Sequence, residues 1–288
     1  VEEAFAQEVS RLTEDVWIFL SEEDRPIFEK LSSFPKKLYP DIADVFVGLQ
    51  TSADKVFILD LLEEGRFTMK VWSRATKKEY ELESELLKPL LKGGDIERWL
   101  VTSHSQVLLF PYRIEKSKKE PIRAILIDER ELKERYPRTW KYLEENKETL
   151  ESRDRGAWKG RTDWYAFGRR QNIEKHEQPK IMTQVLANRA SFAIDEDGTY
   201  YFVGGGNAGG YGVVPKNLNH LYYLAALLNS SLLEWYLKKI SVIFRGGYYS
   251  FAQRFISQLP IVDAAPEEIE KLSNLCLLYT SPSPRDRG

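Results

Sequence analysis

Two stretches of the sequence combine basic with aromatic residues, the types that neutralise phosphates and stack against bases. In the first, residues 153–170, the basic residues are separated by Trp158, Trp164, Tyr165 and Phe167. The second, residues 235–260, has no acidic residue and carries Lys238, Lys239, Arg245 and Arg254. Alone, the first stretch is better explained as a surface loop whose arginines pair with Asp154 and Asp163. Two positive segments in a near-neutral chain instead predict a site for a polyanion.

The composition limits the classes of protein that this chain can belong to. The length of 288 residues suits one large domain or two. The 42 basic side chains nearly balance the 44 acidic ones, which excludes a chain that is basic throughout. No run of about 20 apolar residues is present, so we expect no membrane span and a cytoplasmic location. A single cysteine and three scattered histidines predict neither a disulfide framework nor a metal site.

No motif in the sequence predicts catalysis. Residues 204–210 are glycine-rich, but a phosphate-binding loop requires a helix after it. The extended residues 211–215 follow instead and favour a flexible hairpin between two strands. The acids Asp41, Asp44, Asp54 and Asp60 show no metal-ligand spacing. We therefore expect no catalytic residue, no metal site and no cofactor in this chain itself.

Short strands and a few helices must position the basic and aromatic residues. Apolar runs broken by polar turns predict strands, among them a strand–turn–strand unit at residues 45–59. Residues 137–150 have helical spacing, with Pro137 in the tolerated first turn, and residues 221–237 read as one buried helix. Without a regular βαβ period, the pattern predicts an α+β fold with mixed short-stranded sheets, several helices and a helical N-terminal segment.

Several segments, in the right order, resemble the TaqI-like C-terminal specificity domain of adenine-specific DNA methyltransferases. They cover about residues 41–262 and include an opening strand–turn–strand, a Lys-Pro…Gly…Asp-Ile step and a Trp-Tyr…Gly-Arg passage. The segments are Phe46–Phe57, Leu87–Ile96, Leu109–Tyr112, Tyr142–Arg153, Trp164–Arg169, Pro179–Ile181, Leu227–Ser230, Gly246–Tyr248 and Leu259–Ile261.

The resemblance implies a parent enzyme that transfers a methyl group from S-adenosylmethionine to adenine, with or without a fused endonuclease. The family's motifs for S-adenosylmethionine and for the flipped adenine are not found, since Phe110-Pro111-Tyr112 has one proline and no leading amide or acid. The chain would then recognise double-stranded DNA beside an upstream catalytic domain of the same polypeptide. The base sequence that it recognises stays open.

The resemblance and the charge pattern together nominate residues that contact DNA. In the major groove Arg and Lys recognise guanine, and Asn and Gln recognise adenine. The expected contacts are Gln50, Thr51, Lys55, Arg169, Arg170, Gln171, Asn172, Arg245 and Arg254. The expected phosphate contacts are Arg153, Lys180, Lys238 and Lys239.

Four parts are expected along the chain. Residues 1–40 form a helical linker from a missing upstream methyltransferase domain, and residues 41–262 form the DNA target-recognition domain. Residues 263–275 are a C-terminal helix remnant, and residues 276–288 resemble a translated sequencing adapter, with an ordinary disordered tail as the alternative. Two other functions stay open: a protein-interaction scaffold with an aromatic-rich surface, and a small-molecule enzyme that uses the glycine-rich loop.

Overall fold

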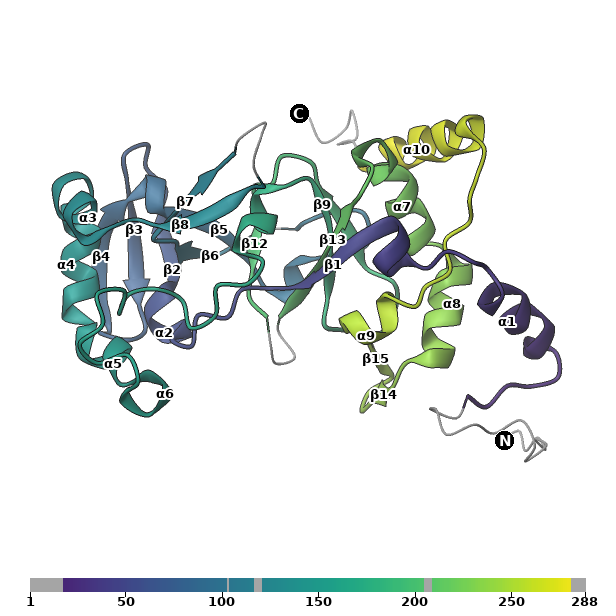
Figure 1. Ribbon diagram of the computed structural model, residues 1–288, viewed down its shortest axis with the longest axis horizontal. Helices are drawn as coiled ribbons and strands as arrows, with labels where there is room; N and C mark the ends of the chain where they lie inside the picture. Colours follow the sequence, from purple (N-terminus) through teal and green to yellow (C-terminus); the bar gives the residue numbers. More distant parts are fainter. Residues whose placement is uncertain (1–17, 103, 117–120, 205–208, 281–288) are drawn as a thin grey trace.

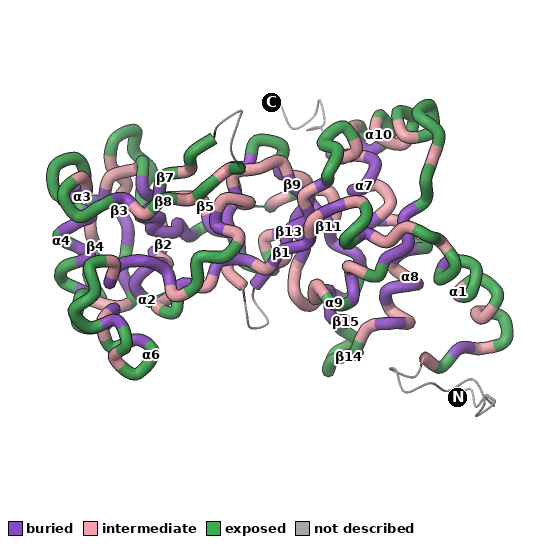
Figure 2. The backbone as a smooth tube through the Cα atoms, viewed as in Figure 1, coloured by how far each residue is buried: buried purple, intermediate pink, exposed green. Residues whose placement is uncertain are grey.

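The computed structural model describes residues 18–102, 104–116, 121–204 and 209–280, and it has two lobes side by side along its long axis (Figure 1). One lobe is built on a six-stranded sheet and the other on a four-stranded sheet. Buried backbone runs through the middle of both lobes, and the exposed segments are mostly loops and helices at the periphery (Figure 2). In the described part of the chain, no helix is long and apolar enough to cross a membrane.

The six-stranded sheet is antiparallel except for one parallel pair at its edge. In spatial order its strands are β12 (Tyr201–Phe202), β5 (Leu87–Leu91), β6 (Gln106–Leu109), β2 (Ile58–Glu63), β3 (Thr68–Ser73) and β4 (Lys78–Glu83). The strand β12 arrives from far along the chain and pairs parallel to β5. A separate hairpin pairs β7 (Tyr112–Glu115) with β8 (Arg123–Leu126).

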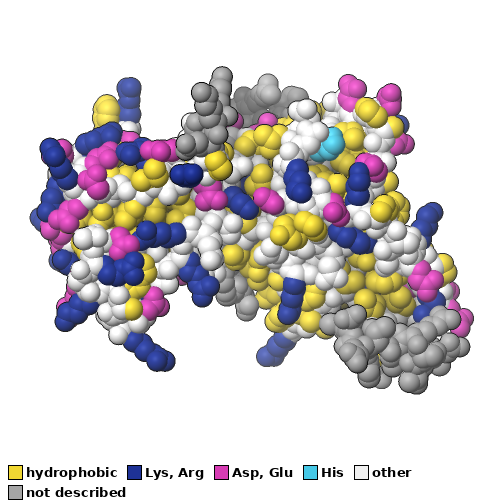
Figure 3. Space-filling view, viewed as in Figure 1, with side chains coloured by type: hydrophobic (Ala, Val, Ile, Leu, Met, Phe, Trp, Pro, Cys, Tyr) yellow, Lys and Arg dark blue, Asp and Glu magenta, His cyan; other side chains and the backbone are white. Residues whose placement is uncertain are grey.

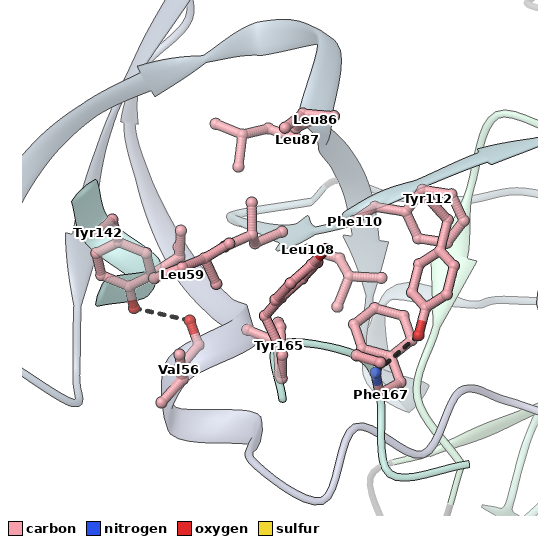
Figure 4. Packing of buried hydrophobic residues seen from close by; sticks show 14 of the residues in the cluster. Val56, Leu59, Leu86, Leu87, Leu108, Phe110, Tyr112, Tyr142, Tyr165 and Phe167 are labelled. Atoms are coloured by element: carbon pink, nitrogen blue, oxygen red, sulfur yellow. Dashed lines mark hydrogen bonds between the residues drawn. The ribbon is translucent and has the colours of Figure 1, made fainter. Parts of the chain in front are cut away.

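Among the residues that the structure describes, five helices belong to this first lobe. They are α2 (Asp54–Phe57), α3 (Glu129–Arg135), α4 (Pro137–Glu145), α5 (Lys147–Glu151) and α6 (Arg153–Gly156). The first N–H groups of α3 are capped by Asp128, whose carboxylate accepts from the N–H of Glu131 at 2.8 Å. In the core, the hydroxyl of Tyr142 donates to the carbonyl of Val56 at 2.7 Å and so ties α4 to α2 (Figure 4).

The second lobe is built on a fully antiparallel sheet. Its strands, in spatial order, are β1 (Ala43–Val47), β13 (Gly210–Pro215), β9 (Lys180–Gln184) and β11 (Phe192–Asp195). Its helices are α1 (Asp24–Ser32), α7 (Leu221–Leu228), α8 (Ser231–Ile240), α9 (Gln253–Ile256) and α10 (Pro266–Thr280). The ring of Phe28 stacks on that of Tyr236 at 4.8 Å, so α1 packs on α8. Cys276 is buried in α10, which continues through the expected boundary at residue 276.

Smaller elements complete the chain. A three-stranded sheet holds β10 (Leu186–Ala187), β15 (Tyr248–Ser250) and β14 (Ile243–Phe244). Short helical turns are found at Leu38–Ile42, Ser84–Leu86, Gly93–Asp95, Ile173–Glu177 and Leu218–His220.

The predicted α+β class, with short mixed sheets and several helices, is confirmed. The strand–turn–strand at residues 45–59 is wrong in detail, because Lys55 lies in α2, whose first turn closes when the N–H of Val56 donates to Ala53 at 2.8 Å. The strands on either side, β1 and β2, also belong to different sheets.

The single helix expected at residues 221–237 is likewise divided into α7 and α8. The side chain of Ser230 accepts from the N–H of Leu233 and starts a new helix. The buried amide of Asn229 exchanges hydrogen bonds with the backbone of Phe192, at 2.8 and 3.0 Å, and so joins the break between the helices to β11.

Candidate nucleic-acid interface

Two segments that are far apart in the sequence meet where β1 leads into α2. The N–H of Arg169 donates to the carbonyl of Gln50 at 3.1 Å, and the N–H of Gly168 donates to the carbonyl of Thr51 at 3.0 Å. Gln50 is half-buried and Arg169 is exposed. An amide and a guanidinium side chain therefore extend from neighbouring backbone segments.

Thr51 shapes the loop that presents Gln50. Its side chain is fully buried, and its hydroxyl donates to the carboxylate of Asp54 and accepts from the N–H of Ala53 at 3.0 Å. Ser52 has a φ of 57°, a left-handed conformation that is uncommon outside glycine. The hydroxyl of Thr51 thus stabilises a tight turn inside the protein, while the exposed Lys55 follows in α2.

The side chain of Arg153 joins the two segments from inside. It is buried, and its guanidinium donates to the backbone carbonyls of Leu150 at 2.7 Å, Thr51 at 3.1 Å, Ala166 at 2.8 Å and Trp164 at 2.6 Å. Burial lowers the pKa of this guanidinium from its ordinary value. These contacts do not fit the expected phosphate contact, because the guanidinium is buried and donates its hydrogen bonds to backbone carbonyls of the same chain.

Aromatic packing supports the segment that leads to Arg169. The N–H of Phe167 donates to the hydroxyl of Tyr112 at 2.7 Å (Figure 4), and burial raises the pKa of that hydroxyl to about 12. The ring of Phe167 also meets that of Phe57 edge-on at 5.0 Å. Beyond Arg169, the chain turns at Asn172, which has a φ of 62° and precedes the helical turn Ile173–Glu177. The intervening residues are held at both ends.

Charge in this segment is partly balanced by Asp163. Its carboxylate accepts two hydrogen bonds from Arg161, at 2.8 and 2.9 Å, and another from Arg170. The hydrogen bond from Arg161, with the one from Arg170, holds the pKa of Asp163 well below its usual range. Within the described residues Arg169 has no ion pair, so its charge is more available than that of Arg170. Gln171 beside them is exposed.

Lys180 is placed differently from the other candidate residues. Its side chain is fully buried, and its ammonium donates to the carboxylate of Asp195, opposite it on β11, and to the carbonyl of His176. Desolvation lowers the pKa of Lys180. Such a pair is part of the core, so the expected phosphate contact does not fit this residue either.

The second basic stretch lies in the other lobe, and its exposed part is residues 242–248 with Arg254 and Gln258. Lys238 pairs with Glu234 and Lys239 with Asp24, each at 2.6 Å, in ion pairs whose side chains are half-buried. Arg245 lies in the turn between β14 and β15, and Arg254 lies in α9 with its guanidinium 4.6 Å from the ring centre of Phe255. Arg245 and Arg254 are both exposed.

A series of backbone hydrogen bonds connects the two basic regions through the ends of the glycine-rich loop. The N–H of Gly204 donates to Leu49 at 2.7 Å, next to Gln50. At the other end of the loop, the N–H of Val185 donates to Gly209 at 3.1 Å, and Val185 accepts from the N–H of Phe251 at 2.9 Å, just after β15. Figure 3 shows Lys and Arg side chains along the lower edge of the molecule, over α6 on one lobe and near β14 on the other.

The glycine-rich loop itself is only partly described, since residues 205–208 lie outside the described part of the chain. A strand, β13, follows it, as expected, but β12 and β13 lie in different sheets, so the expected hairpin is wrong. A Cβ at Gly204 would lie 2.4 Å from the carbonyl oxygen of Gly48, which explains the glycine. The helix N-terminus that a phosphate-binding loop requires is not found after it, because β13 occupies that position.

A model of the TaqI-like C-terminal specificity domain matches residues 88–261, and the chain belongs to this family. The chain is similar to the Type II restriction enzyme and methyltransferase RM.Eco57I of Escherichia coli, with 28% identity over 269 residues, which are 88% of this chain and 26% of that protein. It is also similar to the Type II methyltransferase M.BanIII of Aneurinibacillus aneurinilyticus, with 25% identity over 84% of this chain and 38% of the relative.

A third relative is the Type II methyltransferase M.MjaIV of Methanocaldococcus jannaschii, with 26% identity over 90% of this chain and 78% of the relative. The chain thus spans 26% and 38% of the first two relatives and 78% of the third. The resemblance to restriction–modification methyltransferases that was read from short motifs is confirmed.

Proposed function

We propose that this chain is the DNA sequence-recognition lobe of a site-specific adenine DNA methyltransferase of the restriction–modification type. Its family and its methyltransferase relatives support this role. The single observation that carries the proposal is the contact between Gln50 and Arg169, which brings two base-reading side-chain types to one place.

Each side chain has a chemical partner in the major groove. The amide of Gln50 matches the donor and acceptor of adenine, and the guanidinium of Arg169 matches the two acceptors of guanine. Arg170, Gln171 and Asn172 follow Arg169 directly in the chain, and Lys55 comes five residues after Gln50, so the proposal adds them to the same surface. Good bidentate pairs discriminate against a wrong base by about 1–3 kcal/mol each.

Backbone phosphates are contacted by the second basic stretch in this proposal. Arg245 and Arg254 are exposed, whereas Lys238 and Lys239 are half-buried and pair with Glu234 and Asp24. Arg245 and Arg254 are therefore free to bind phosphates directly, and a phosphate that binds Lys238 or Lys239 replaces the acidic partner. Contacts of this kind position a protein on DNA without reading its sequence.

Methyl transfer belongs to a catalytic domain that precedes this lobe in the parent polypeptide. That domain would bind S-adenosylmethionine and hold the extruded adenine, while the present chain holds the flanking duplex. The proposed location of both is the cytoplasm. A fused endonuclease, as the name of the relative RM.Eco57I indicates for that protein, is compatible with the same role.

The proposal is tested by binding of the chain to duplex DNA at several salt concentrations. A lobe that displaces counterions from several phosphates gives a log–log slope of several units. A protein-interaction scaffold, the alternative function, gives weak binding and a slope close to zero. The second result would contradict the proposal. The recognised base sequence need not be known for this test, because salt-dependent binding to phosphates is independent of base sequence.

A further inference from the structure

The hairpin of β14 and β15 exposes apolar side chains on both of its faces. Ile243 is 66% exposed, and Val242, Phe244 and Tyr248 are 41–44% exposed. The register pairs Phe244 with Tyr248 and Ile243 with Tyr249. Paired residues share a face of a two-stranded ribbon, and neighbours along a strand point to opposite faces. Phe244 and Tyr248 therefore lie on one face, and Ile243 lies on the other.

The base of the hairpin is fixed and its tip is thin. The hydroxyl of Ser241 donates to the carbonyl of Ser250 at 2.6 Å, and β15 pairs with β10. At the tip, Gly246 and Gly247 have φ values of 87° and 77°, which favour glycine, and Arg245 is the large side chain of the turn. A thin ribbon on a fixed base has the shape of a wedge, whereas a flat docking surface exposes apolar residues on one face.

The charged residues within the hairpin and after it up to residue 262 are basic. No acidic residue occurs in residues 235–262, and Arg245 lies in the turn. The ammonium of Lys238 lies 5.4 Å from the ring centre of Tyr249 and also pairs with Glu234. Apolar side chains beside cations suit a partner that has negatively charged groups at its periphery and flat apolar surfaces in its interior. Duplex DNA has this arrangement, with phosphates around stacked bases, and proteins use apolar wedges to separate base steps.

We propose that the hairpin, residues 242–249, inserts apolar side chains between base pairs of the bound duplex. The inference rests on the proposed function and deepens it. Its position agrees, because the carbonyl of Val185 accepts from the N–H of Phe251, just after β15, and the N–H of Val185 donates to Gly209 at one end of the glycine-rich loop. The other end of that loop, Gly204, donates to Leu49, which precedes Gln50. Arg245 would then contact the phosphates next to the separated step.

The experiment compares binding of the chain to an intact duplex and to the same duplex with one abasic site. A wedge must pay for unstacking, and a preformed gap removes that cost, so the wild type should bind the abasic duplex about tenfold more tightly. The double variant Ile243→Ser/Phe244→Ser removes an apolar side chain from each face. We expect the ratio of its affinities for the abasic and the intact duplex to fall to about one. Because both residues are partly solvent-exposed, the fold should be retained, which circular dichroism checks.

A matched control carries the same kind of change elsewhere. The variant Leu62→Ser/Phe67→Ser alters side chains that are 49% and 79% exposed near the turn between β2 and β3, and it should keep the wild-type ratio. DNA binding without a preference for the abasic duplex would overturn the wedge and leave the proposed function intact. No DNA binding at all would overturn the proposed function. A hairpin variant that changes the oligomeric state and not the ratio would show that a second copy covers the hairpin, against the inference.

Discussion

The N–H of Arg169 donates to the carbonyl of Gln50 at 3.1 Å, so a residue of the loop after β1 and a residue of the basic stretch share one antiparallel bridge. The geometry of this bridge depends on buried groups on both sides. Arg153 donates to carbonyls on both segments, and the hydroxyl of Tyr112 accepts from Phe167. Substitution of Arg153 or Tyr112 should therefore shift the backbone at the bridge between Gln50 and Arg169.

Arg153 should be essential for stability. We expect Arg153→Met to lower the free energy of unfolding by about 3 kcal/mol, because the buried carbonyls of Ala166 and Trp164 lose the guanidinium donor. The carbonyl of Thr51 also loses this donor and keeps the N–H of Gly168. Urea unfolding measures this change. The exposed Lys159 nearby serves as the control, since Lys159→Ala should alter stability by less than about 0.5 kcal/mol. Equal stability of Arg153→Met and wild type would show that Arg153 does not anchor the segments.

The carboxylate of Asp163 should restrain the charge of Arg170. In Asp163→Asn the carboxylate charge is lost, so DNA binding should strengthen and its log–log salt slope should rise by about one unit. Glu134→Gln removes a comparable charge from the exposed pair with Arg130 on α3 and should leave the slope unchanged. An identical slope in the two variants would argue that Arg170 does not contact DNA.

Reversal of the charges at Arg169 and Arg170 should weaken DNA binding. We expect Arg169→Glu/Arg170→Glu to reduce affinity about 50-fold at low salt, since attractive contacts to phosphate or base become repulsive. The exposed residues Arg66 and Arg130 provide a control with the same change in net charge. If Arg66→Glu/Arg130→Glu weakened binding as strongly, the effect would come from net charge and the site would lie elsewhere.

Acid should destabilise the protein through His176. This side chain is fully buried and stacks against Tyr201 at 5.3 Å, and burial lowers its pKa to about 3. The unfolded chain has the ordinary pKa near 6.5, so it binds more protons than the folded chain at lower pH. Stability is therefore complete above pH 6.5 and falls as the pH decreases towards the folded pKa.

The size of this loss follows from the two pKa values. Between pH 6.5 and pH 5 the histidine should cost about 1.5 kcal/mol. His176→Phe should remove this part of the pH dependence, as measured by urea unfolding at both values. A wild type and variant with parallel pH profiles would show that His176 titrates normally in the folded protein.

Local sequence signals were sufficient for elements whose cause is local. The helix α4 was predicted near residue 137 because Pro137 suits a first turn and apolar residues recur at helical spacing. The division between α7 and α8 was missed, since the apolar pattern continues across it. The signal was present in Ser230, an N-cap residue type within an apolar run.

The burial of basic residues depends on distant segments, so composition does not reveal it. Arg153 and Lys180 look like phosphate ligands in the sequence, but their partners come from Thr51, Ala166 and Asp195 in other parts of the chain. Conversely, the sequence nominates both Gln50 and Arg169 as DNA contacts, through the resemblance to a family and through charge, but it does not predict that they lie side by side. The backbone pairing that brings them together is a tertiary feature.

The most direct test of the central claim is selection of preferred sites from a pool of random duplexes by the wild-type chain, Gln50→Ala and Arg169→Ala. The proposal predicts that the wild type enriches one defined sequence. Each variant should relax the preference at one base pair, and the two positions should be adjacent or nearly so, because the residues share a backbone bridge. Enrichment of no sequence, or variants with the same preferences as the wild type, would contradict it.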